Sequence, residues 1–287
     1  MFKGSIVALV TPFTADGKVD KQTLMNLVSW QIEKGTDGIV CNGTTGESFS
    51  LSDDERLEVL KACVVAAKGR CAVIAGTGHS STSKTVEMTK KAKLLGADGC
   101  LVVVPYYNRP TQLGCVAHFQ EVSKVKLPMI VYNNPIRTGL SLQTETIALL
   151  KNIPIVVGIK EASGDMDVVR QIRNKSNIPL FSGCDELTVG IMSLGGVGCI
   201  STVANIIPDK WKEIVSLCQK KLFDDAFKLS QKYEEFIKAI FIEPNPQGVK
   251  YALNLIGKCN AFVRMPLLEA SLSTKDKIKT SLFKFVC

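Results

Sequence analysis

Eight short apolar runs rich in Val and Ile recur along this chain, and a helix-length amphipathic segment follows each of them. Near-continuous apolar runs are typical of parallel strands whose two faces are both covered. Eight strand-then-helix units without a break in composition predict a closed (β/α)8 TIM barrel. An open doubly wound sheet is the alternative, but no G-x-G-x-x-G turn follows the first run to favour it. The runs are residues 5–10, 38–42, 71–76, 100–104, 129–132, 155–159, 179–182 and 198–201.

The last quarter of the chain carries no strand pattern. Its periodicity predicts helices over residues 223–242, 247–256 and 274–285. We therefore expect a catalytic barrel over residues 1–221 and an α-helical extension over 222–287, which adds to the barrel without forming a separate catalytic domain. A length of 287 residues suits this single-barrel organisation.

Net charge and hydropathy indicate which kinds of molecule this protein can bind. Lys and Arg outnumber Asp and Glu by 35 to 27, a net charge of +8. This balance favours anionic partners, but the basic residues are scattered, which indicates a solvated surface rather than nucleic-acid binding. No apolar run approaches the ~20 residues of a membrane span, and the first run is too short for a secretory signal. We expect a cytoplasmic protein without membrane or nucleic-acid partners.

Cysteine and histidine usage limits metal and disulfide chemistry. None of the ten cysteines forms a C-x-x-C pair, and several lie in apolar patterns where Cys packs as a small hydrophobe. His79 and His118 are too few for a zinc site. We expect reduced, mostly buried thiols and no bound metal. The cysteines are residues 41, 63, 71, 100, 115, 184, 199, 218, 259 and 287.

The active site of such a barrel lies at the carboxyl ends of its strands. The residues that close the predicted strands include one lysine, three tyrosines, two adjacent threonines and one arginine, but no histidine. This set suits carbonyl chemistry on a small anion better than hydrolysis. The residues are Thr44, Thr45, Tyr106, Tyr107, Tyr132, Arg137 and Lys160.

Lys160 is the centre of this set because it follows an apolar run, which places its amine among apolar side chains. Its position is equally compatible with an amine that extends into water. Desolvation and a nearby cation lower a lysine pKa by up to ~3–5 units, enough to make a Schiff-base nucleophile. Tyr132, Tyr107 and Thr44 predict a chain of hydroxyl groups that moves the protons of Schiff-base formation. Each tyrosine by itself is also compatible with a rim aromatic whose hydroxyl is bound to water.

Two features at the strand ends predict anion binding. Thr45 and the backbone amide of Thr44 lie in a Gly-flanked turn that can hold a carboxylate through backbone and hydroxyl donors. Arg137, after Pro135, is placed to bind a second carboxylate in bidentate fashion. An arginine in a Pro/Gly loop is also a common surface residue, so the other motifs must decide its role.

Taken together, these motifs resemble the 4-hydroxy-tetrahydrodipicolinate synthase (dihydrodipicolinate synthase) family of pyruvate-dependent class I aldolases. The resemblance covers essentially the whole chain. It is carried by G-T-T-G-E-S at 43–48, P-Y-Y-N-R-P at 105–110 and G-I-K-E-A-S-G-D at 158–165. The Arg137-Thr138-Gly139 stretch that follows Tyr132 is the more discriminating part.

The resemblance implies that Lys160 forms a Schiff base with pyruvate. Tyr132 is implied to donate and accept protons above it, in a relay with Thr44 and with a Tyr107 contributed across a tight-dimer interface. The implied assembly is a homotetramer, a dimer of such dimers. No metal or organic cofactor is implied, because the Schiff base on Lys160 supplies the chemistry.

The resemblance also implies how the substrates bind. Thr45 is implied to bind the carboxylate of pyruvate and Arg137 the carboxylate of aspartate semialdehyde. The backbones of Gly183 and Ile200 are implied to complete the pocket. The implied reaction is the condensation of pyruvate with L-aspartate-4-semialdehyde in diaminopimelate and lysine biosynthesis.

Two other functions stay open at this point. Lyases of the same superfamily that cleave sugar acids, such as N-acetylneuraminate lyase, share Lys160 and Tyr132. Arg137 favours the synthase, because a neutral sugar chain offers that charge no partner, and such lyases usually have Ser at Thr44. A non-catalytic pyruvate-binding barrel is the third possibility, although binding alone needs no proton relay.

The chain departs from the family at the positions where lysine-inhibited relatives bind lysine. Ser48 and Tyr106 match these relatives, but four other positions differ. At Lys84, where those relatives have a glutamate, a cation would repel the ammonium group of the ligand. We expect weak or absent feedback inhibition by lysine. The four positions are Asp53, Arg56, Ser80 and Lys84.

Overall fold

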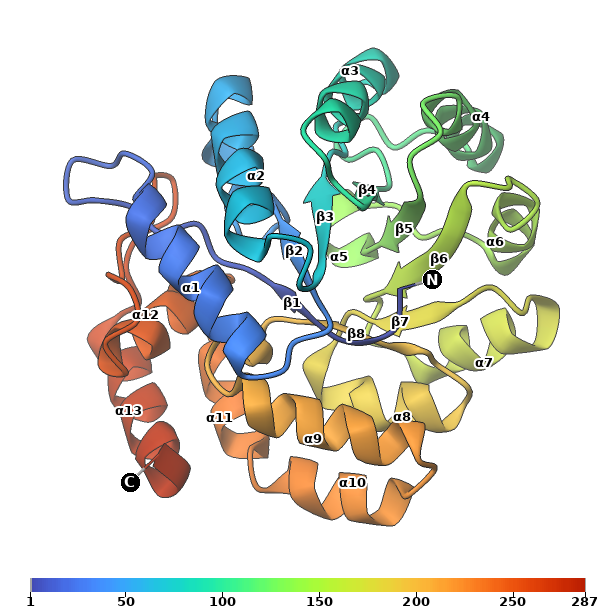
Figure 1. The fold of residues 1–287 in the computed structure, drawn as a ribbon. Coiled ribbons are helices and arrows are strands. Elements are labelled where there is room, and N and C mark those ends of the chain that lie inside the picture. Colours follow the sequence, from blue (N-terminus) through green and yellow to red (C-terminus); the bar gives the residue numbers. More distant parts are fainter. Residues whose placement is uncertain (1, 287) are drawn as a thin grey trace.

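Parallel strands follow one another around a closed barrel, and the last strand pairs with the first (Figure 1). The computed structural model describes residues 2–286. All eight predicted strands are confirmed, with ends that differ from the predicted ones by no more than two residues. The strands are β1 Gly4–Ala8, β2 Gly38–Cys41, β3 Ala72–Gly76, β4 Gly99–Val103, β5 Met129–Asn133, β6 Val156–Glu161, β7 Leu180–Ser182 and β8 Gly198–Ser201.

Helices cover the outside of the barrel, as a (β/α)8 TIM barrel requires (Figure 1). Short 3-10 turns lie at η1 Ser48–Ser50, η2 Asp185–Leu187 and η3 Val203–Asn205. The helices that accompany the strands are α1 Lys21–Glu33, α2 Asp53–Ala67, α3 Thr82–Leu94, α4 Gln112–Ser123, α5 Pro135–Thr138, α6 Thr144–Leu150, α7 Met166–Lys175, α8 Thr188–Ser193 and α9 Pro208–Gln219.

Both faces of the strands are buried, which explains their near-continuous apolar sequences. Successive side chains point alternately into the barrel and toward the helices. The outward residues join the larger core beneath the helices. The barrel interior is filled by Ile6, Ala8, Val40, Ile74, Leu101, Ile130, Tyr132, Ala162, Phe181 and Ile200.

Strand β6 extends beyond its predicted end, so Lys160 lies inside the strand instead of just after it. The register places Lys160 directly opposite Tyr132 of β5. Paired residues on neighbouring strands point to the same face of a sheet. Both side chains therefore point into the mouth of the barrel, at the same level.

The predicted single helix over residues 223–242 is wrong. The segment forms two helices, α10 Phe223–Gln231 and α11 Glu234–Ile240, which are separated at Lys232 and Tyr233. The break has a packing cause, because α10 contacts α8 and α9 whereas α11 contacts α13. A straight helix could not cover both surfaces. The other two helices of the extension are α12 Gln247–Leu255 and α13 Leu272–Val286.

In the described residues, none of the helices is long and apolar enough to span a membrane. Residues 2–286 also contain no group of His, Cys, Asp or Glu side chains that could hold a metal ion. Nine cysteines are free thiols, and seven of them are buried, as predicted. Cys287 lies outside the described residues.

Candidate active site

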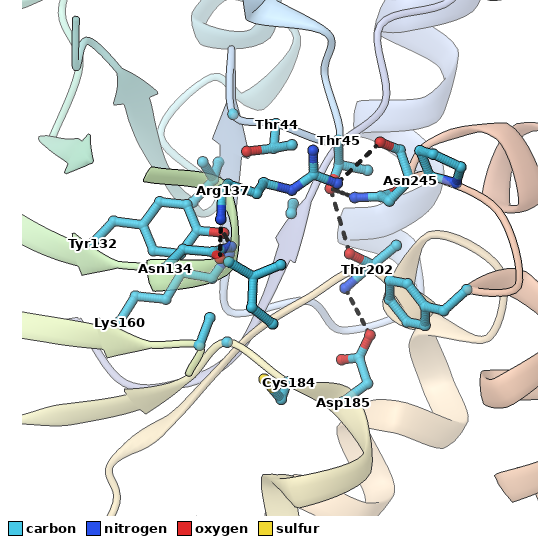
Figure 2. Close-up of a pocket in the computed structure, with 18 of the residues that line it drawn as sticks. Thr44, Thr45, Tyr132, Asn134, Arg137, Lys160, Cys184, Asp185, Thr202 and Asn245 are labelled. Atoms are coloured by element: carbon cyan, nitrogen blue, oxygen red, sulfur yellow. Dashed lines mark hydrogen bonds between the residues drawn. The ribbon is translucent and has the colours of Figure 1, made fainter. Parts of the chain in front are cut away.

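A cavity of about 540 Å³ opens at the carboxyl ends of the strands (Figure 2). Residues from most strand ends and from the C-terminal extension line it. Six of the predicted site residues lie on its wall, so the barrel brings together most of the set that the sequence indicated. These residues are Thr44, Thr45, Tyr132, Arg137, Lys160 and Gly183.

Lys160 is 7% exposed, and its Nζ lies 4.4 Å from the centre of the Tyr132 ring. No described acidic side chain forms an ion pair with it. Gly183 makes room for the lysine, because a Cβ at this position would lie 2.9 Å from the Lys160 Cε. The lysine is therefore a buried amine that faces a cavity and has no ion-pair partner among the described residues.

The phenol oxygen of Tyr132 accepts a hydrogen bond of 2.7 Å from the Nδ2 of Asn134. Thr44 lines the same cavity, on the loop after β2. Its backbone oxygen accepts a hydrogen bond from the amide of Glu47, which closes the turn. The lysine, the phenol and a hydroxyl group therefore surround one space. Addition of an amine to a carbonyl group needs such nearby groups to transfer protons.

The wall opposite Lys160 is a chain of hydrogen bonds through Thr45 (Figure 2). Its hydroxyl accepts a hydrogen bond of 2.9 Å from Asn245 and lies 3.3 Å from the hydroxyl of Thr202. The backbone N–H of Thr202 donates to Asp185 at 3.0 Å. Burial raises the pKa of Asp185, although hydrogen bonds from Ser201, Val203 and Thr202 oppose this shift. Thr45 is thus held in place by residues from three other segments.

Arg137 lies at the rim on the short helix α5 and is exposed. Its Nη2 donates to the backbone oxygen of Asn245 at 3.4 Å. No described carboxylate forms an ion pair with it. A guanidinium without a counter-ion at the rim of a cavity suits a ligand that carries a carboxylate.

Two predicted site residues do not line the cavity of their own chain. Tyr107 is 94% exposed, with a positive φ of 73°, and it does not line the cavity. Ile200 is buried in the barrel interior and contributes no wall to the cavity. Of the predicted tyrosine pair, therefore, only Tyr132 lies within the site that this chain forms alone.

Sequence reasoning missed several residues of the cavity wall. Asn134 follows Tyr132 closely, but an Asn before Pro is typical of any turn. Asp185 and Thr202 follow predicted strand ends, and that position was a usable signal. Asn245 comes from the extension, 200 residues from the Thr45 that it contacts. No local pattern marks such a residue.

The sequence model of the Dihydrodipicolinate synthetase family matches residues 1–284. This chain belongs to that family. The 4-hydroxy-tetrahydrodipicolinate synthase of Thermodesulfovibrio yellowstonii is 44% identical over 281 residues, which cover 97% of this chain and 96% of that protein.

Solved structures agree with the assignment to the dihydrodipicolinate synthetase family. Dihydrodipicolinate synthase from Aquifex aeolicus superposes with a TM-score of 0.96 at 40% identity, over 99% of this chain and 98% of that one. DHDPS from Cyanidioschyzon merolae with lysine bound superposes with a TM-score of 0.94 at 37% identity, over 98% and 97% of the two chains. The family explains both the barrel and its C-terminal helices.

The positions expected to differ from lysine-binding members of the dihydrodipicolinate synthetase family gather near Arg56. This residue is buried, and its Nη2 donates to the backbone oxygen of Gly76 at 3.0 Å. The carboxylate of Asp53 lies 3.8 Å from its Nη1. Burial lowers the pKa of His79, and Lys84 and Arg56 lower it further. Positive charge therefore prevails in this region.

Proposed function

We propose that the barrel mouth condenses pyruvate with L-aspartate-4-semialdehyde, the 4-hydroxy-tetrahydrodipicolinate synthase reaction of diaminopimelate and lysine biosynthesis. Membership of an enzyme family supports this, as do full-length relatives that carry that name. One observation carries the proposal at the level of residues. Among the described residues, a buried lysine that forms no ion pair faces a cavity whose rim holds an arginine that also forms none.

The first stage activates pyruvate. The Lys160 amine attacks the keto carbon, and the carbinolamine loses water to give an iminium ion. The pyruvate methyl group then loses a proton, and the electrons move to the nitrogen to form an enamine. Tyr132 gives a proton to the departing hydroxyl and accepts protons in the reverse steps. Its place beside the Lys160 Nζ supports this role.

The second stage joins the substrates. The enamine carbon attacks the aldehyde of the semialdehyde, and the new alkoxide takes a proton. The amine of the semialdehyde then adds to the iminium carbon and displaces Lys160, so the product leaves as a ring and the lysine is free again. The net reaction releases one water molecule. No metal or organic cofactor is needed for any of these steps.

The carboxylates select the substrates. Thr45 binds the pyruvate carboxylate, with help from the backbone near Gly183, which also lines the cavity. Arg137 binds the carboxylate of the semialdehyde at the rim, where a guanidinium pairs with a planar anion in bidentate fashion. The open position of Arg137 above the cavity supports this assignment.

A second copy of the chain completes the proton relay. Tyr107 is almost fully exposed on a backbone with positive φ, which supports a role at an interface with another copy. We assign it to the relay of the partner subunit, together with Thr44 and Tyr132. The assembly is a homotetramer made of two such dimers.

The test is turnover of pyruvate with aspartate semialdehyde, coupled to the reductase that consumes the cyclic product. We expect turnover that Lys160→Ala abolishes. Arg137→Ala should raise the KM for the semialdehyde by about 10²-fold, because a charge-assisted bidentate contact is lost. The KM for pyruvate should change little.

Reduction with borohydride separates the alternatives. Pyruvate trapped on Lys160 without turnover would keep the Schiff-base barrel and move the assignment to a sugar-acid lyase. Failure to trap pyruvate at all would instead favour a barrel that binds without catalysis. A Lys160→Arg variant is the matched control, since it keeps the charge and cannot form the Schiff base.

A further inference from the structure

Asn134 is a buried amide that contacts the phenol of Tyr132 (Figure 2). It follows β5 directly, and its Nδ2 donates to the phenol oxygen at 2.7 Å. The phenol oxygen receives no other hydrogen bond from the described residues. An amide in this place therefore acts on the proposed proton-transfer group and on no other titratable side chain.

The orientation of the amide is set by the start of helix α5. The Oδ1 of Asn134 accepts a hydrogen bond of 3.3 Å from the backbone N–H of Arg137. A backbone N–H is a donor only, so the amide oxygen must face it. The NH2 group must then face Tyr132, which makes the phenol oxygen the acceptor. The hydroxyl proton of Tyr132 is left to point toward the cavity.

This arrangement has a chemical consequence. A phenol that passes protons alternates between a neutral hydroxyl and an anionic oxygen. An N–H donor stabilises the anionic oxygen more than the neutral one. We propose that Asn134 is a positioning residue for proton transfer by Tyr132, because its amide fixes the phenol whose ring lies beside the Lys160 Nζ and stabilises the phenol oxygen when the proton leaves. This inference rests on the proposed role of Tyr132.

The same side chain has a structural duty, which the test must separate. Asn134 caps the helix that carries Arg137, and its backbone oxygen accepts the Thr138 hydroxyl at 3.0 Å. Loss of the cap would disturb semialdehyde binding through Arg137. Loss of the N–H donor would disturb proton transfer through Tyr132. The two losses predict different kinetic constants.

The test compares Asn134→Asp with the unaltered enzyme. Aspartate keeps the oxygen that caps α5 but has no N–H to donate to the phenol. We expect kcat to fall by about 10²-fold, a part of what acid–base catalysis supplies, with the semialdehyde KM changed by less than about twofold. The phenolate absorbance of Tyr132 should appear at higher pH, measured against the same variant carrying Tyr132→Phe. This absorbance needs no substrate.

Asn134→Ser is the matched second variant, because serine also caps a helix and its hydroxyl is too short to reach the phenol. It should lower kcat without the added negative charge. In a Tyr132→Phe background, Asn134→Asp should cause no further loss, since both changes act on one group. Thermal unfolding of each variant reports whether the cap is intact.

Three results would overturn the inference. A raised KM for the semialdehyde with unchanged kcat would assign Asn134 to the helix cap alone. If Asn134→Asp lowered kcat equally with and without the Tyr132 hydroxyl, Asn134 would act on a group other than Tyr132. Full activity of Tyr132→Phe would remove the proposed role of Tyr132 and this inference with it, whereas the first two results leave the proposed reaction intact.

Discussion

Two lysines are buried in the described part of the chain, and the fold treats them in opposite ways. Lys250, on α12 of the extension, is fully buried and lies 2.5 Å from Glu47, which is also fully buried. Its Nζ donates to the backbone oxygen of Phe262 at 2.7 Å and lies 4.0 Å from the Phe13 ring centre. Lys160 has an aromatic ring beside it and forms no ion pair with a carboxylate of the described residues.

The difference shows how the two regions use charge. Burial lowers the pKa of Lys250, while the neighbouring Glu47 opposes this shift and stabilises the ammonium. An ammonium that is buried without such a partner costs several kcal/mol. The fold supplies such a partner at Lys250, where the lysine joins the extension to the barrel, whereas Lys160 forms no ion pair among the described residues.

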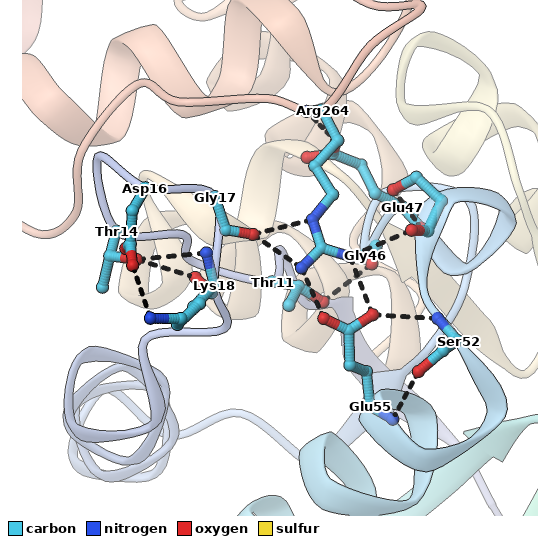
Figure 3. A network of polar contacts seen from close by, with 11 residues as sticks. Thr11, Thr14, Asp16, Gly17, Lys18, Gly46, Glu47, Ser52, Glu55 and Arg264 are labelled. Atoms are coloured by element: carbon cyan, nitrogen blue, oxygen red, sulfur yellow. Dashed lines mark hydrogen bonds and ion pairs between the residues drawn. The ribbon is translucent and has the colours of Figure 1, made fainter.

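Glu47 also belongs to a polar cluster that includes Arg264, Glu55 and the backbone of Gly17 (Figure 3). The backbone N–H of Arg264 donates to Glu47 at 3.0 Å, and its guanidinium contacts Glu55 and the backbone oxygen of Gly17. Glu47 itself has a left-handed backbone with φ of 52°, which is unfavourable for a residue with a Cβ. The cluster holds the end of the 43–47 turn, which also contains Thr45.

The largest expected effect is at Lys160. Lys160→Met should reduce turnover by about 10³-fold or more, because no other amine replaces the proposed nucleophile. The free energy of unfolding should stay the same or increase, since a buried group without a counter-ion is replaced by an apolar side chain of similar length. Coupled turnover and urea unfolding check both results. A large loss of stability would contradict the view that Lys160 has no structural partner.

Lys250→Met should give the opposite result. Glu47 would keep a buried carboxylate with no partner, so the unfolding free energy should fall by about 3–5 kcal/mol. The KM for pyruvate should rise in the folded enzyme, because the turn that holds Thr45 loses its anchor. Urea unfolding measures the stability change.

A double variant serves as the control for this ion pair. Glu47→Gln together with Lys250→Met removes both charges, so part of the lost stability should return. A double variant as unstable as the sum of the single ones would mean that the pair contributes through packing alone.

The sequence was enough to predict one of these regions and not the other. Lys160 follows an apolar run at a position where barrels carry their active sites, so strand periodicity and position identified it. Glu47 and Lys250 lie 203 positions apart in the sequence (250 − 47), and neither lies in a pattern that indicates pairing. Asn245 was missed for the same reason. Contacts between the extension and the barrel depend on how α11 and α12 pack.

The prediction of a single helix over residues 223–242 was wrong for a similar reason. Amphipathic periodicity continues through Lys232 and Tyr233, so nothing local marks the break between α10 and α11. The chain turns there because the two halves pack against different helices. Sequence periodicity reports that a face is apolar but does not report which surface covers it. Local patterns therefore predicted the strands, and tertiary packing decided the rest.

A smaller effect on stability is expected at the ion pair between Arg264 and Glu55, which is the more exposed part of the polar cluster. Arg264 holds the pKa of Glu55 at about 2, below its ordinary value of 4.5. The unfolded chain therefore takes up a proton at Glu55 before the folded chain does, so this stabilisation is complete above pH 4.5 and is lost as the pH falls toward 2. Glu55→Gln should cost about 1 kcal/mol at neutral pH.

Glutamine is a suitable replacement at Glu55 because it can still accept the hydrogen bond from the Ser52 backbone in the capping box of α2. The stability curves of Glu55→Gln and the unaltered protein should converge as the pH falls from 4.5 toward 2. Thermal unfolding across this range measures the convergence. Parallel curves would mean that the Arg264 contact does not depend on the carboxylate charge.

The smallest expected effect concerns a third buried cation, Arg56. Its nearest carboxylate, Asp53, is 3.8 Å away and belongs to an exposed side chain, so the region keeps a positive charge. Lysine in this region would bring its ammonium near Lys84, where a like charge costs on the order of 1 kcal/mol or more. We expect about 1 mM lysine to inhibit turnover by less than half.

Lys84→Glu is the sharpest check on that expectation. The substitution replaces the repelling charge with a carboxylate that pairs with the ligand ammonium, so inhibition by lysine should strengthen by about 10-fold. Lys84→Gln controls for the loss of the cation alone and should have a smaller effect. Half-maximal inhibition of the unaltered enzyme by submillimolar lysine would falsify the expectation. It would also mean that Arg56, despite its weak pairing, is arranged to bind the carboxylate of the ligand.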